Sequence, residues 1–400
     1  MRFGNFGIAA TAIAVVLGAA AARADDTVVI GDIDDLSGVY ADVIGQGGIE
    51  AANMAIADFG GTVLGKKITF VSADHQNKPD IAASKFREWA DQSHVNMILG
   101  GSNTGTSIAM SKVANEKKVP FIAIGAAGAS LTNADCNAYM VHYGYDTVSL
   151  ANGTATTIVQ GGGKKWFYLT ADYAFGTQLQ DAASKVVVAN GGTNIGSVRV
   201  PLGASDFSSF LLQAQSSGAD VLGLSNAGAD TQNSLKAAQE FGLTKTMKPA
   251  ALLAFLTDIH SVGIQAAQGL ILTDAWYWDS NDDTRAWSKR FFEKMKKEPT
   301  WNQAAYYSAT LHYLNAVKEV GGTDPDKVMA QMKQDKVNDM FAKGGYIRAD
   351  GLLIHDMTVM QVKTPAESKG EWDLYKPLKV IKGEDAYGPI TGLCPLAPKP

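Results

Sequence analysis

Short apolar runs alternate along the chain with longer segments in which apolar residues recur every three or four positions. Runs such as residues 27–33, rich in β-branched side chains, are typical of buried parallel strands. In residues 46–59 the apolar side chains of Ile49, Ile56 and Phe59 share one face of a helix. The first part of the chain is therefore predicted to contain strands at 27–33, 68–73, 95–99 and 120–124 and helices at 46–59, 79–93 and 106–117.

The same alternation restarts near residue 165. It predicts strands at 165–170, 195–200, 221–224 and 249–254, and helices at 176–189, 208–217 and 231–241. Residues 27–145 and 146–272 thus form two units of similar length and order, although no sequence identity between them is evident. Because strands that alternate with helices favour open parallel sheets covered on both faces, we predict an α/β protein with doubly wound sheets.

The remaining third of the chain is mainly helical. After a strand-like run at 269–274, helices are predicted at 284–297, 303–320 and 325–334, and short strands at 346–348 and 357–362. From residue 377 the sequence is rich in Pro and Gly, which predicts a wrapped or loose tail.

The composition is that of a folded protein with few charges. Of the 400 residues, 46% are hydrophobic and 19% charged, which excludes disorder. At roughly 150 residues per domain, the chain has room for two or three domains. Its 35 basic and 40 acidic residues give a net charge of −5. Because no basic excess is present to neutralise phosphates, no nucleic acid is expected as a partner.

The first 24 residues have the three-part layout of a secretory signal peptide. Arg2 gives a positive start, residues 8–22 are apolar, and Ala22-Arg23-Ala24 matches a cleavage site. The alternative is a membrane anchor, but about 20 apolar residues are needed to span a bilayer and this core is shorter. We therefore expect cleavage near Ala24 and export to the periplasm.

Motifs that would indicate an enzyme fail on spacing or context. Residues 60–67 resemble a phosphate-binding loop, but they follow a helix, and Lys67 stands where a hydroxyl should hold magnesium. Ser225 lacks the second glycine of a nucleophile elbow, and the six histidines form no pair at helical spacing. Two cysteines cannot make a four-thiolate metal site. We expect no cofactor and no metal; a periplasmic hydrolase whose catalytic residues meet only in three dimensions stays an alternative.

Candidate binding residues follow the ends of the predicted strands, where open α/β sheets bind their ligands. In the first unit the loops after 95–99 and 120–124 are small, and the free N–H groups of a helix start favour an anion. Their candidate residues are Ser102, Asn103, Thr104, Gly125, Ala126 and Ala127. Later candidates, mostly aromatic, are Asp172, Tyr173, Phe175, Asn226, Phe255, Trp276 and Trp301. The alternatives are helix capping for the loops and core packing for the rings.

A series of short motifs runs in order through nearly the whole chain after residue 24. They are Leu36-Ser-Gly38, Gly47-Gly-Ile-Glu-Ala-Ala52, Asp74, the 100–107 loop, Val119-Pro-Phe-Ile122, Asp172-Tyr-Ala-Phe-Gly176, Gly269-Leu-Ile271 and Asp350-Gly351. Together with the N-terminal segment, this set resembles the Leu/Ile/Val-binding family of periplasmic solute-binding proteins, the receptors of ABC importers.

The resemblance implies a type I periplasmic binding fold, in which two lobes joined by three crossovers close over a ligand. The crossovers would lie near residues 145, 273 and 347. One lobe would comprise residues 25–145 and 274–346, the other residues 146–273 and 347–376, and the tail 377–400 would pack on the first lobe. The resemblance also implies a monomeric binding protein, not an enzyme, that delivers a small solute to membrane permease and ATPase subunits.

The resemblance also implies how a ligand would be held. Its carboxylate would contact Ser102–Thr104 and the backbone of Gly125–Ala127. Family members hold the ligand amine with a hydroxyl in the second loop and an acid at a strand end, but here these positions read Ala127 and Ala251 or Leu252. An ammonium buried without such partners costs several kcal/mol. We therefore predict a small carboxylate without an α-amino group, such as an aromatic acid.

Two interpretations of the ligand stay open. In one, Asp172 accepts an amine and the ligand is a branched-chain amino acid or an amide. In the other, Tyr173 or Asn226 hydrogen-bonds a ligand hydroxyl, while the rings of Phe175 and Phe255 cover an aromatic or aliphatic body.

The two cysteines are expected to be bridged, because an even pair in an exported protein is more often oxidised than free. A disulfide between Cys136 and Cys394 would tie the tail to the first lobe.

Overall fold

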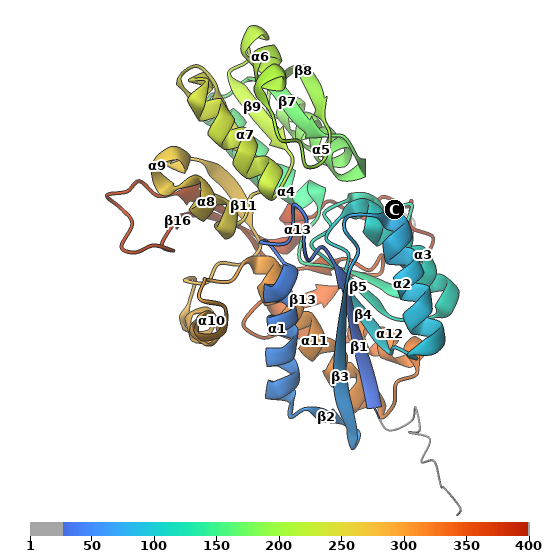
Figure 1. Ribbon diagram of the computed structural model, residues 1–400. Helices are drawn as coiled ribbons and strands as arrows, with labels where there is room; N and C mark the ends of the chain where they lie inside the picture. Colours follow the sequence, from blue (N-terminus) through green and yellow to red (C-terminus); the bar gives the residue numbers. More distant parts are fainter. Residues whose placement is uncertain (1–26, 399–400) are drawn as a thin grey trace, which may run out of the picture.

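The computed structural model describes residues 27–398, which form two lobes joined by a narrow middle region (Figure 1). The predicted signal peptide, residues 1–24, lies outside the described residues. The first lobe contains a six-stranded sheet with the order β2-β3-β1-β4-β5-β6. Its strands are β1 (Thr27–Asp34), β2 (Thr62–Val63), β3 (Lys66–Asp74), β4 (Met97–Gly100), β5 (Phe121–Ile124) and β6 (Met140–Tyr143). All neighbours are parallel except β2 and β3.

Helices cover both faces of this sheet (Figure 1). On one face α2 (Pro79–Gln92) packs beside α3 (Thr104–Lys117), and on the other α1 (Gly45–Phe59) packs beside α11 (Trp301–Val320). The helices α10 (Asp282–Met295) and α12 (Pro325–Gln334) extend the second layer. The helix α3 begins two residues before its predicted start because the side chain of Asn103 accepts hydrogen bonds from its first turn.

The second lobe contains a parallel four-stranded sheet with the order β10-β9-β7-β8. Its strands are β7 (Lys165–Ala171), β8 (Thr193–Val200), β9 (Val221–Ser225) and β10 (Lys248–Ala251). Side chains alternate between two apolar cores: Trp166 and Tyr168 belong to one, Phe167 and Leu169 to the other. The first core includes residues of α4 (Thr147–Gln160) and α5 (Ala174–Ala189), and the second residues of α6 (Ser208–Ser216) and α7 (Ala229–Glu240).

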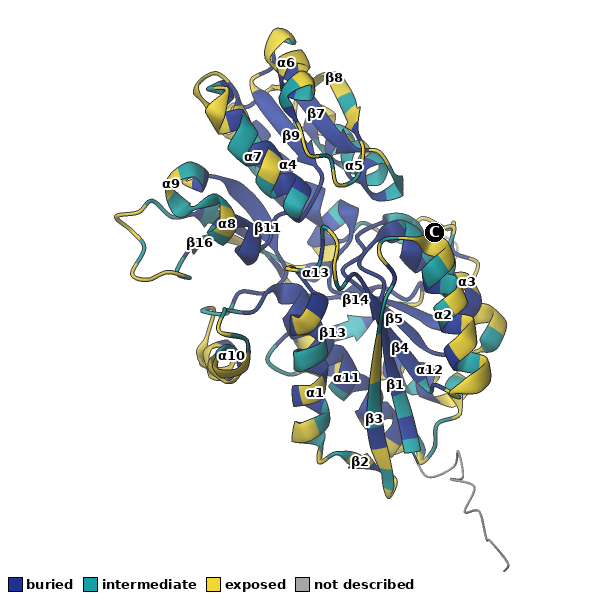
Figure 2. Cartoon of the chain, in the orientation of Figure 1, coloured by how far each residue is buried: buried dark blue, intermediate teal, exposed yellow. Residues whose placement is uncertain are grey.

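Burial follows these layers. In Figure 2 the central strands of both lobes are mostly dark blue, whereas β3, β8 and the outer faces of the helices show teal and yellow. All four residues of β4 are buried, as its continuous apolar sequence indicates. The chain is thus an α/β protein with two doubly wound lobes, as predicted. The sequence pattern missed β6 and α4, which lie at the end of the first predicted unit and at the start of the second.

Two small antiparallel sheets form the region between the lobes and the edge of the first lobe. One has the order β11-β15-β16, from β11 (Ile271–Asp274), β15 (Met357–Val362) and β16 (Tyr375–Ile381). The other has the order β12-β13-β14, from β12 (Lys336–Asn338), β13 (Lys343–Ile347) and β14 (Leu353–Ile354). The short helices α8 (Leu256–Val262), α9 (Ile264–Ala267) and α13 (Gly383–Ala386) complete the fold with the 3-10 turns η1 (Ala129–Thr132) and η2 (Leu243–Lys245).

Two predicted boundaries are wrong. The third crossover does not lie near residue 347, because β13 pairs with β14 and Leu352 bridges His142 of β6. The chain therefore stays with the first lobe through β14 and crosses near His355. The tail also does not begin at residue 377, because β16 continues to Ile381 as a paired strand.

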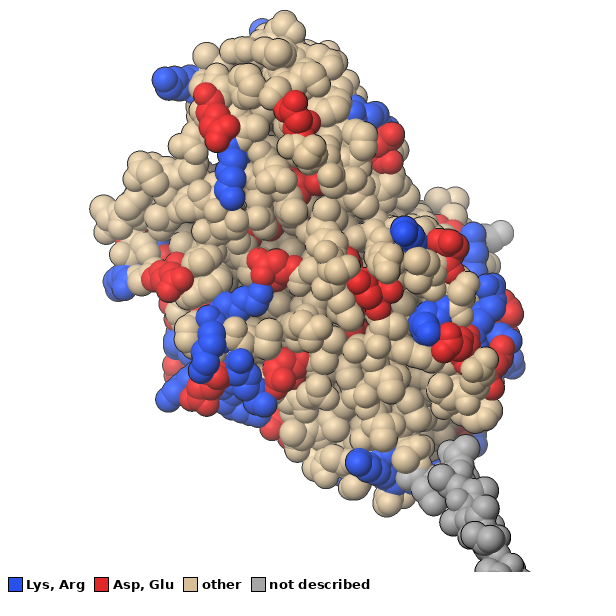
Figure 3. All heavy atoms as spheres, viewed as in Figure 1, with Lys and Arg blue, Asp and Glu red and all other residues tan. Residues whose placement is uncertain are grey.

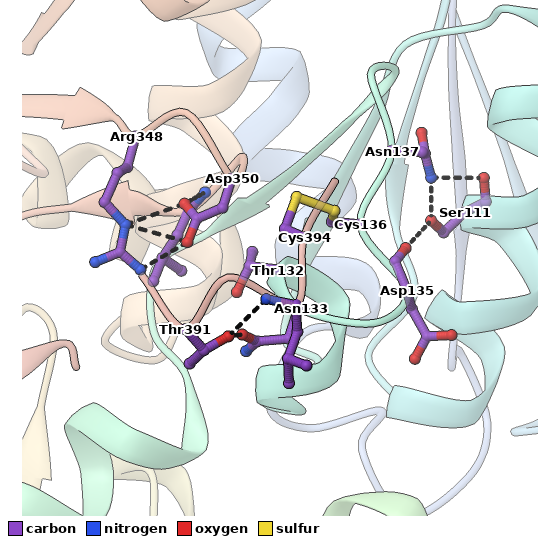
Figure 4. Close-up of a disulfide and its surroundings, with 12 residues drawn as sticks. Ser111, Thr132, Asn133, Asp135, Cys136, Asn137, Arg348, Asp350, Thr391 and Cys394 are labelled. Carbon is purple, nitrogen blue, oxygen red and sulfur yellow. Dashed lines mark hydrogen bonds and ion pairs between the residues drawn. A yellow bond between two sulfur atoms is a disulfide. The ribbon is translucent and has the colours of Figure 1, made fainter. Parts of the chain in front are cut away.

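Cys136 and Cys394 form the predicted disulfide, with their Cα atoms 5.7 Å apart (Figure 4). The C-terminal segment, residues 382–398, reaches this bridge along the region between the lobes. Tyr387 donates a hydrogen bond from its hydroxyl to the carbonyl of Gly144 at 2.8 Å, and Arg348 donates to the carbonyl of Gly388 at 2.7 Å. The segment therefore contacts the first crossover before it ends on the first lobe.

Candidate ligand-binding cleft

The strand order of each sheet places a crevice where the two lobes face each other. In the first sheet β1 lies between β3 and β4, and in the second β7 lies between β8 and β9. Successive strands are therefore added on opposite sides of β1 and of β7, which makes a topological switch point beside each. Ligands of open α/β sheets bind outside the strand ends at such switch points. A cleft lies there. It is lined by Tyr40, Val43, Ile44, Ser102, Thr104, Gly125, Ala127 and Asn302 of one lobe and Tyr173, Phe175, Ala227, Leu253 and Phe255 of the other.

Seven of the predicted residues line this cleft. They are Ser102, Thr104, Gly125, Ala127, Tyr173, Phe175 and Phe255. Because the strands of each sheet are parallel, the loops that follow them lie at one edge of that sheet. The loops after β4 and β5 of the first lobe and those after β7 and β10 of the second line the same cleft.

The loop after β4 offers a hydroxyl and the start of a helix to the cleft. The backbone N–H of Ser102 donates to Asp34 Oδ1 at 3.1 Å, which fixes the loop against β1. The Oγ of Ser102 is buried and has no hydrogen-bond partner within residues 27–398. Thr104 begins α3 and accepts the N–H of Gly128 at 3.1 Å with its hydroxyl. An unpartnered hydroxyl beside the positive end of a helix dipole favours an anionic ligand group.

Three predicted binding residues have structural contacts instead. Asn103 caps α3 by accepting the N–H of Gly105 at 2.8 Å. Asn226 is buried, accepts the hydroxyl of Thr231 at 2.8 Å and donates to the carbonyl of Asp230 at 3.3 Å. The carbonyl of Ala126 is 2.6 Å from His142 Nε2. These three residues lie outside the cleft lining because their polar groups are directed into the protein.

The remaining predicted residues also lie outside the lining. Asp172 is exposed and is not among the residues that line the cleft. Trp276 is 7% exposed and donates from Nε1 to the carbonyl of Met340 at 2.9 Å, which makes it a core residue. Trp301 lies behind the lining, where its ring stacks on that of Phe255 with 5.4 Å between centroids.

Aromatic rings form the wall on the side of the second lobe. The rings of Tyr173 and Phe175 are 5.7 Å apart, and the ring of Phe255 stacks on that of Trp301, which begins α11 of the first lobe. Trp301 is in turn 3.7 Å from the ring of Tyr145, whose hydroxyl donates to the carbonyl of Gly125 at 2.6 Å. The wall is therefore mainly aromatic, and suited to the flat face of a ring or to an aliphatic chain.

Sequence reasoning missed six lining residues: Tyr40, Val43, Ile44, Ala227, Leu253 and Asn302. Asn302 is 1% exposed, and neither polar atom of its amide has a hydrogen-bond partner among the described residues. Tyr40 reaches the cleft because Asp35, after β1, accepts its backbone N–H at 2.9 Å. The consecutive acids Asp34 and Asp35, which end and follow β1, could have indicated this fixed loop, but nothing in the helical pattern of α11 distinguishes Asn302.

The lining contains no Asp, Glu, Lys, Arg or His. Behind it, Asp258 accepts the N–H of Phe255 at 3.0 Å and the amide of Gln232 at 2.8 Å. Burial raises the pKa of Asp258 to about 7, and these hydrogen bonds oppose the rise. On the face of the molecule in Figure 3, acidic and basic side chains gather mainly on the lower lobe, and most of the upper lobe is uncharged.

The lobes touch across the cleft. The hydroxyls of Tyr40 and Tyr173, one from each lobe, share a hydrogen bond. The N–H of Ala229 donates to the carbonyl of Val39 at 3.1 Å. Gln178 of α5 accepts the N–H of Ser130 at 3.0 Å. The described conformation is therefore a closed one.

Comparisons with known proteins agree with this architecture. Residues 27–371 match a family described as periplasmic binding protein. The chain belongs to this family. Its members are substrate-binding transport proteins that act with ABC permeases, which confirms the family predicted from the motifs. Among curated relatives, a Leu/Ile/Val-binding protein homologue of Brucella melitensis is 26% identical over 295 residues, covering 72% of this chain and 74% of the relative.

Solved structures share the fold over nearly the whole chain. A periplasmic binding protein from Burkholderia mallei is 57% identical, with a TM-score of 0.91 over 93% of this chain and 99% of that one. A branched-chain amino acid ABC transporter ligand-binding protein from Burkholderia xenovorans is 39% identical, with a TM-score of 0.82 over 92% and 99%. A solute-binding protein of Rhodopseudomonas palustris in complex with 4-hydroxybenzoate is 23% identical, with a TM-score of 0.82 over 92% and 99%. In the described part of this chain, no helix is both long and apolar enough to cross a membrane.

Proposed function

We propose that this protein is the receptor of an ABC importer for a small carboxylate that lacks an α-amino group, with aromatic acids as the favoured class. One observation carries the proposal: the lining of the cleft combines the free hydroxyl of Ser102, near the start of α3, with an aromatic wall, and it holds no charged side chain. The hydroxyl of Ser102, beside the positive end of the α3 dipole, would receive the carboxylate, and Tyr173, Phe175 and Phe255 would cover the ring.

The uncharged lining also argues against an α-ammonium group. Such a cation would lose its hydration without a carboxylate to pair with, at a cost of several kcal/mol. The alternative ligand, a branched-chain amino acid or an amide, is favoured by the description of the Burkholderia xenovorans protein. Asn302 also supports it, because its free amide could accept a hydrogen bond from an amine or amide N–H.

The proposed mechanism is capture by closure. The lobes would rotate about the three crossovers, exclude water from the cleft, and be held by contacts such as that between Tyr40 and Tyr173. The closed monomer would then dock on the permease and its ATPase subunits and release the solute. We propose no catalytic role and no nucleic-acid partner. Export to the periplasm after cleavage near Ala24 is part of the same proposal.

Thermal-shift measurements on the chain without residues 1–24 test the ligand class. Benzoate, 4-hydroxybenzoate and 3,4-dihydroxybenzoate should raise the melting temperature, because a ligand at 100 times its Kd adds about 2.7 kcal/mol to the stability. Leucine, isoleucine and valine should have little effect. Stabilisation by these amino acids but by none of the aromatic acids would refute the proposed ligand class.

A further inference from the structure

Two buried carboxyl groups, those of Asp32 and Asp34, contact one tyrosine hydroxyl beneath Ser102. Asp32 and Asp34 are alternate residues of β1, so their side chains lie on the same face of the sheet. The hydroxyl of Tyr306, from α11, is 2.8 Å from Asp32 Oδ1 and also contacts Asp34 Oδ2. None of the three residues is more than 1% exposed.

A tyrosine hydroxyl carries one hydrogen and can donate it to only one of these carboxyl groups. The second contact is a hydrogen bond only if the other carboxyl is protonated and donates to the oxygen of Tyr306. If both Asp32 and Asp34 were ionised, one pair of oxygen atoms would face each other without a hydrogen, in a place that excludes water. The two contacts of the Tyr306 hydroxyl therefore require that one of the two carboxyl groups is protonated.

The partners of each carboxyl group show which one holds this proton. Asp34 Oδ1 accepts the N–H of Asp35 at 2.7 Å and the N–H of Ser102 at 3.1 Å, which are contacts for a negative charge. Asp32 has the hydroxyl of Tyr306 alone, and its Oδ2 has no hydrogen-bond partner within residues 27–398. The charge is thus best placed on Asp34 and the proton on Asp32.

We propose that Asp32 is protonated at neutral pH and donates a hydrogen bond to Tyr306, which in turn donates to ionised Asp34. Asp34 accepts the N–H of Ser102, so this series of hydrogen bonds positions Ser102 beneath an anionic ligand. The three side chains then carry only one negative charge. Ionisation of Asp32 would add a second buried charge of the same sign as the ligand and would make one contact of Tyr306 repulsive. Affinity for an anion should therefore fall as the pH rises. This consequence rests on the proposed function, whereas the proton on Asp32 does not.

The titratable groups that face the pair are consistent with this assignment. Burial, with the charge of Asp34 adding to it, raises the pKa of Asp32 well above its usual range, although the hydrogen bond from Tyr306 opposes the rise. His75 faces Asp34 at 3.8 Å, and its Nδ1 is 3.0 Å from the donating N–H of Asn77, which places the proton of a neutral ring on Nε2. Burial lowers the pKa of His75.

Other groups lie close to the pair. Asp35 accepts the N–H groups of Gly38 and Tyr40 and the amide of Asn77. Burial raises the pKa of Tyr145, and that of Tyr306 well above its usual range, so both phenols keep their protons.

Infrared spectroscopy of the chain without residues 1–24 tests the proton directly, because protonated and ionised carboxyl groups absorb at different frequencies. Other buried acids, such as Asp258 and Asp274, have raised pKa values and also contribute to this band, so the signal of Asp32 is measured as a difference between spectra. At pH 7 the wild-type spectrum minus that of Asp32→Asn should contain a protonated-carboxyl band, whereas the wild-type spectrum minus that of Asp172→Asn, an exposed control in the other lobe, should not. A difference between wild type and Asp32→Asn that lacks this band would overturn the proposal. If Asp32→Asn does not fold, Tyr306→Phe takes its place: loss of the hydrogen bond to Tyr306 should shift the band, and an unchanged band would overturn the proposal.

Stability and binding give two further readouts. Because folding raises the pKa of Asp32, the protein loses stability as the pH rises from the unfolded-state pKa of about 4 to the folded-state pKa, and no further above it. The free energy of unfolding of the wild type should therefore fall over this range relative to that of Asp32→Asn. The Kd for 4-hydroxybenzoate should rise several-fold as the pH passes through the folded-state pKa in the wild type, and less in the variant. If the wild type binds no aromatic acid, the proposed function fails, while the infrared result still decides the position of the proton.

Discussion

Ser102 uses its two polar groups differently. Its N–H is held by Asp34, whereas its buried Oγ is left without a partner in the described part of the chain. A buried polar group without a hydrogen bond costs about 1–3 kcal/mol. The residue is thus fixed in position with its hydroxyl unused, and a ligand carboxylate would remove that cost.

Replacing this hydroxyl should weaken ligand binding without harming the fold. A hydrogen bond to a charged group contributes about 1.5–3 kcal/mol, so we expect Ser102→Ala to raise the Kd for an aromatic acid by about tenfold to a hundredfold. Calorimetric titration measures the change. Ser225→Ala is the matched control, because its Oγ is also buried without a partner but lies outside the cleft lining. Equal effects of the two substitutions would show that Ser102 does not contact the ligand.

At the scale of elements, the approach of the lobes depends on one glycine before α7. Gly228 has φ +60° and ψ −136°, and a Cβ atom built there would lie 2.4 Å from the carbonyl oxygen of Val39 in the opposite lobe. That carbonyl accepts the N–H of Ala229 when the lobes are together. A side chain at this position would therefore collide with the first lobe in this conformation, in addition to the strain that a Cβ atom brings to a residue with this positive φ.

We expect Gly228→Ala to hold the lobes apart. Overpacking at a close contact costs about 1–3 kcal/mol, so the Kd should rise roughly fivefold to a hundredfold, and small-angle scattering with ligand should show a larger radius of gyration than in the wild type. Gly242→Ala, at the other end of α7, is the control: its φ is +69°, and a Cβ atom there would meet nothing within 4 Å. A Gly228→Ala protein that compacts with ligand as the wild type does would contradict this role.

The elements were easier to predict than the side chains of the site. The 3.6-residue and continuous apolar patterns placed most strands and helices, because burial dictates them. They missed β6 and α4. In α4, residues 147–160, small and hydroxyl side chains weaken the apolar periodicity. In the cleft, the loop positions were predictable from topology, but the direction of each side chain was not. Asn103 and Asn226 have the residue type of a ligand contact and are directed into the protein, and Asn302 has the same type and lines the cleft.

At the scale of the whole molecule, the lobes are linked by more than the three crossovers. The C-terminal segment follows the first crossover through Tyr387 and then ends at the disulfide on the first lobe. Asn152 of α4 donates to the carbonyl of Ala386 at 2.8 Å, so the segment also contacts the second lobe in the helix that follows the first crossover. The proposed closure would therefore take place around a hinge that the end of the chain supports on one side.

The central claim is that the closed cleft accepts a carboxylate and excludes an α-ammonium group. Calorimetric titration with phenylacetate and phenylglycine tests it most directly, because the two molecules share a carboxylate and a phenyl ring and differ only in the α-amino group. Since an unpaired buried ammonium costs several kcal/mol, we expect phenylacetate to bind with one site per chain and phenylglycine to bind at least about a hundredfold more weakly. Tighter binding of phenylglycine, or of leucine, than of phenylacetate would contradict the account.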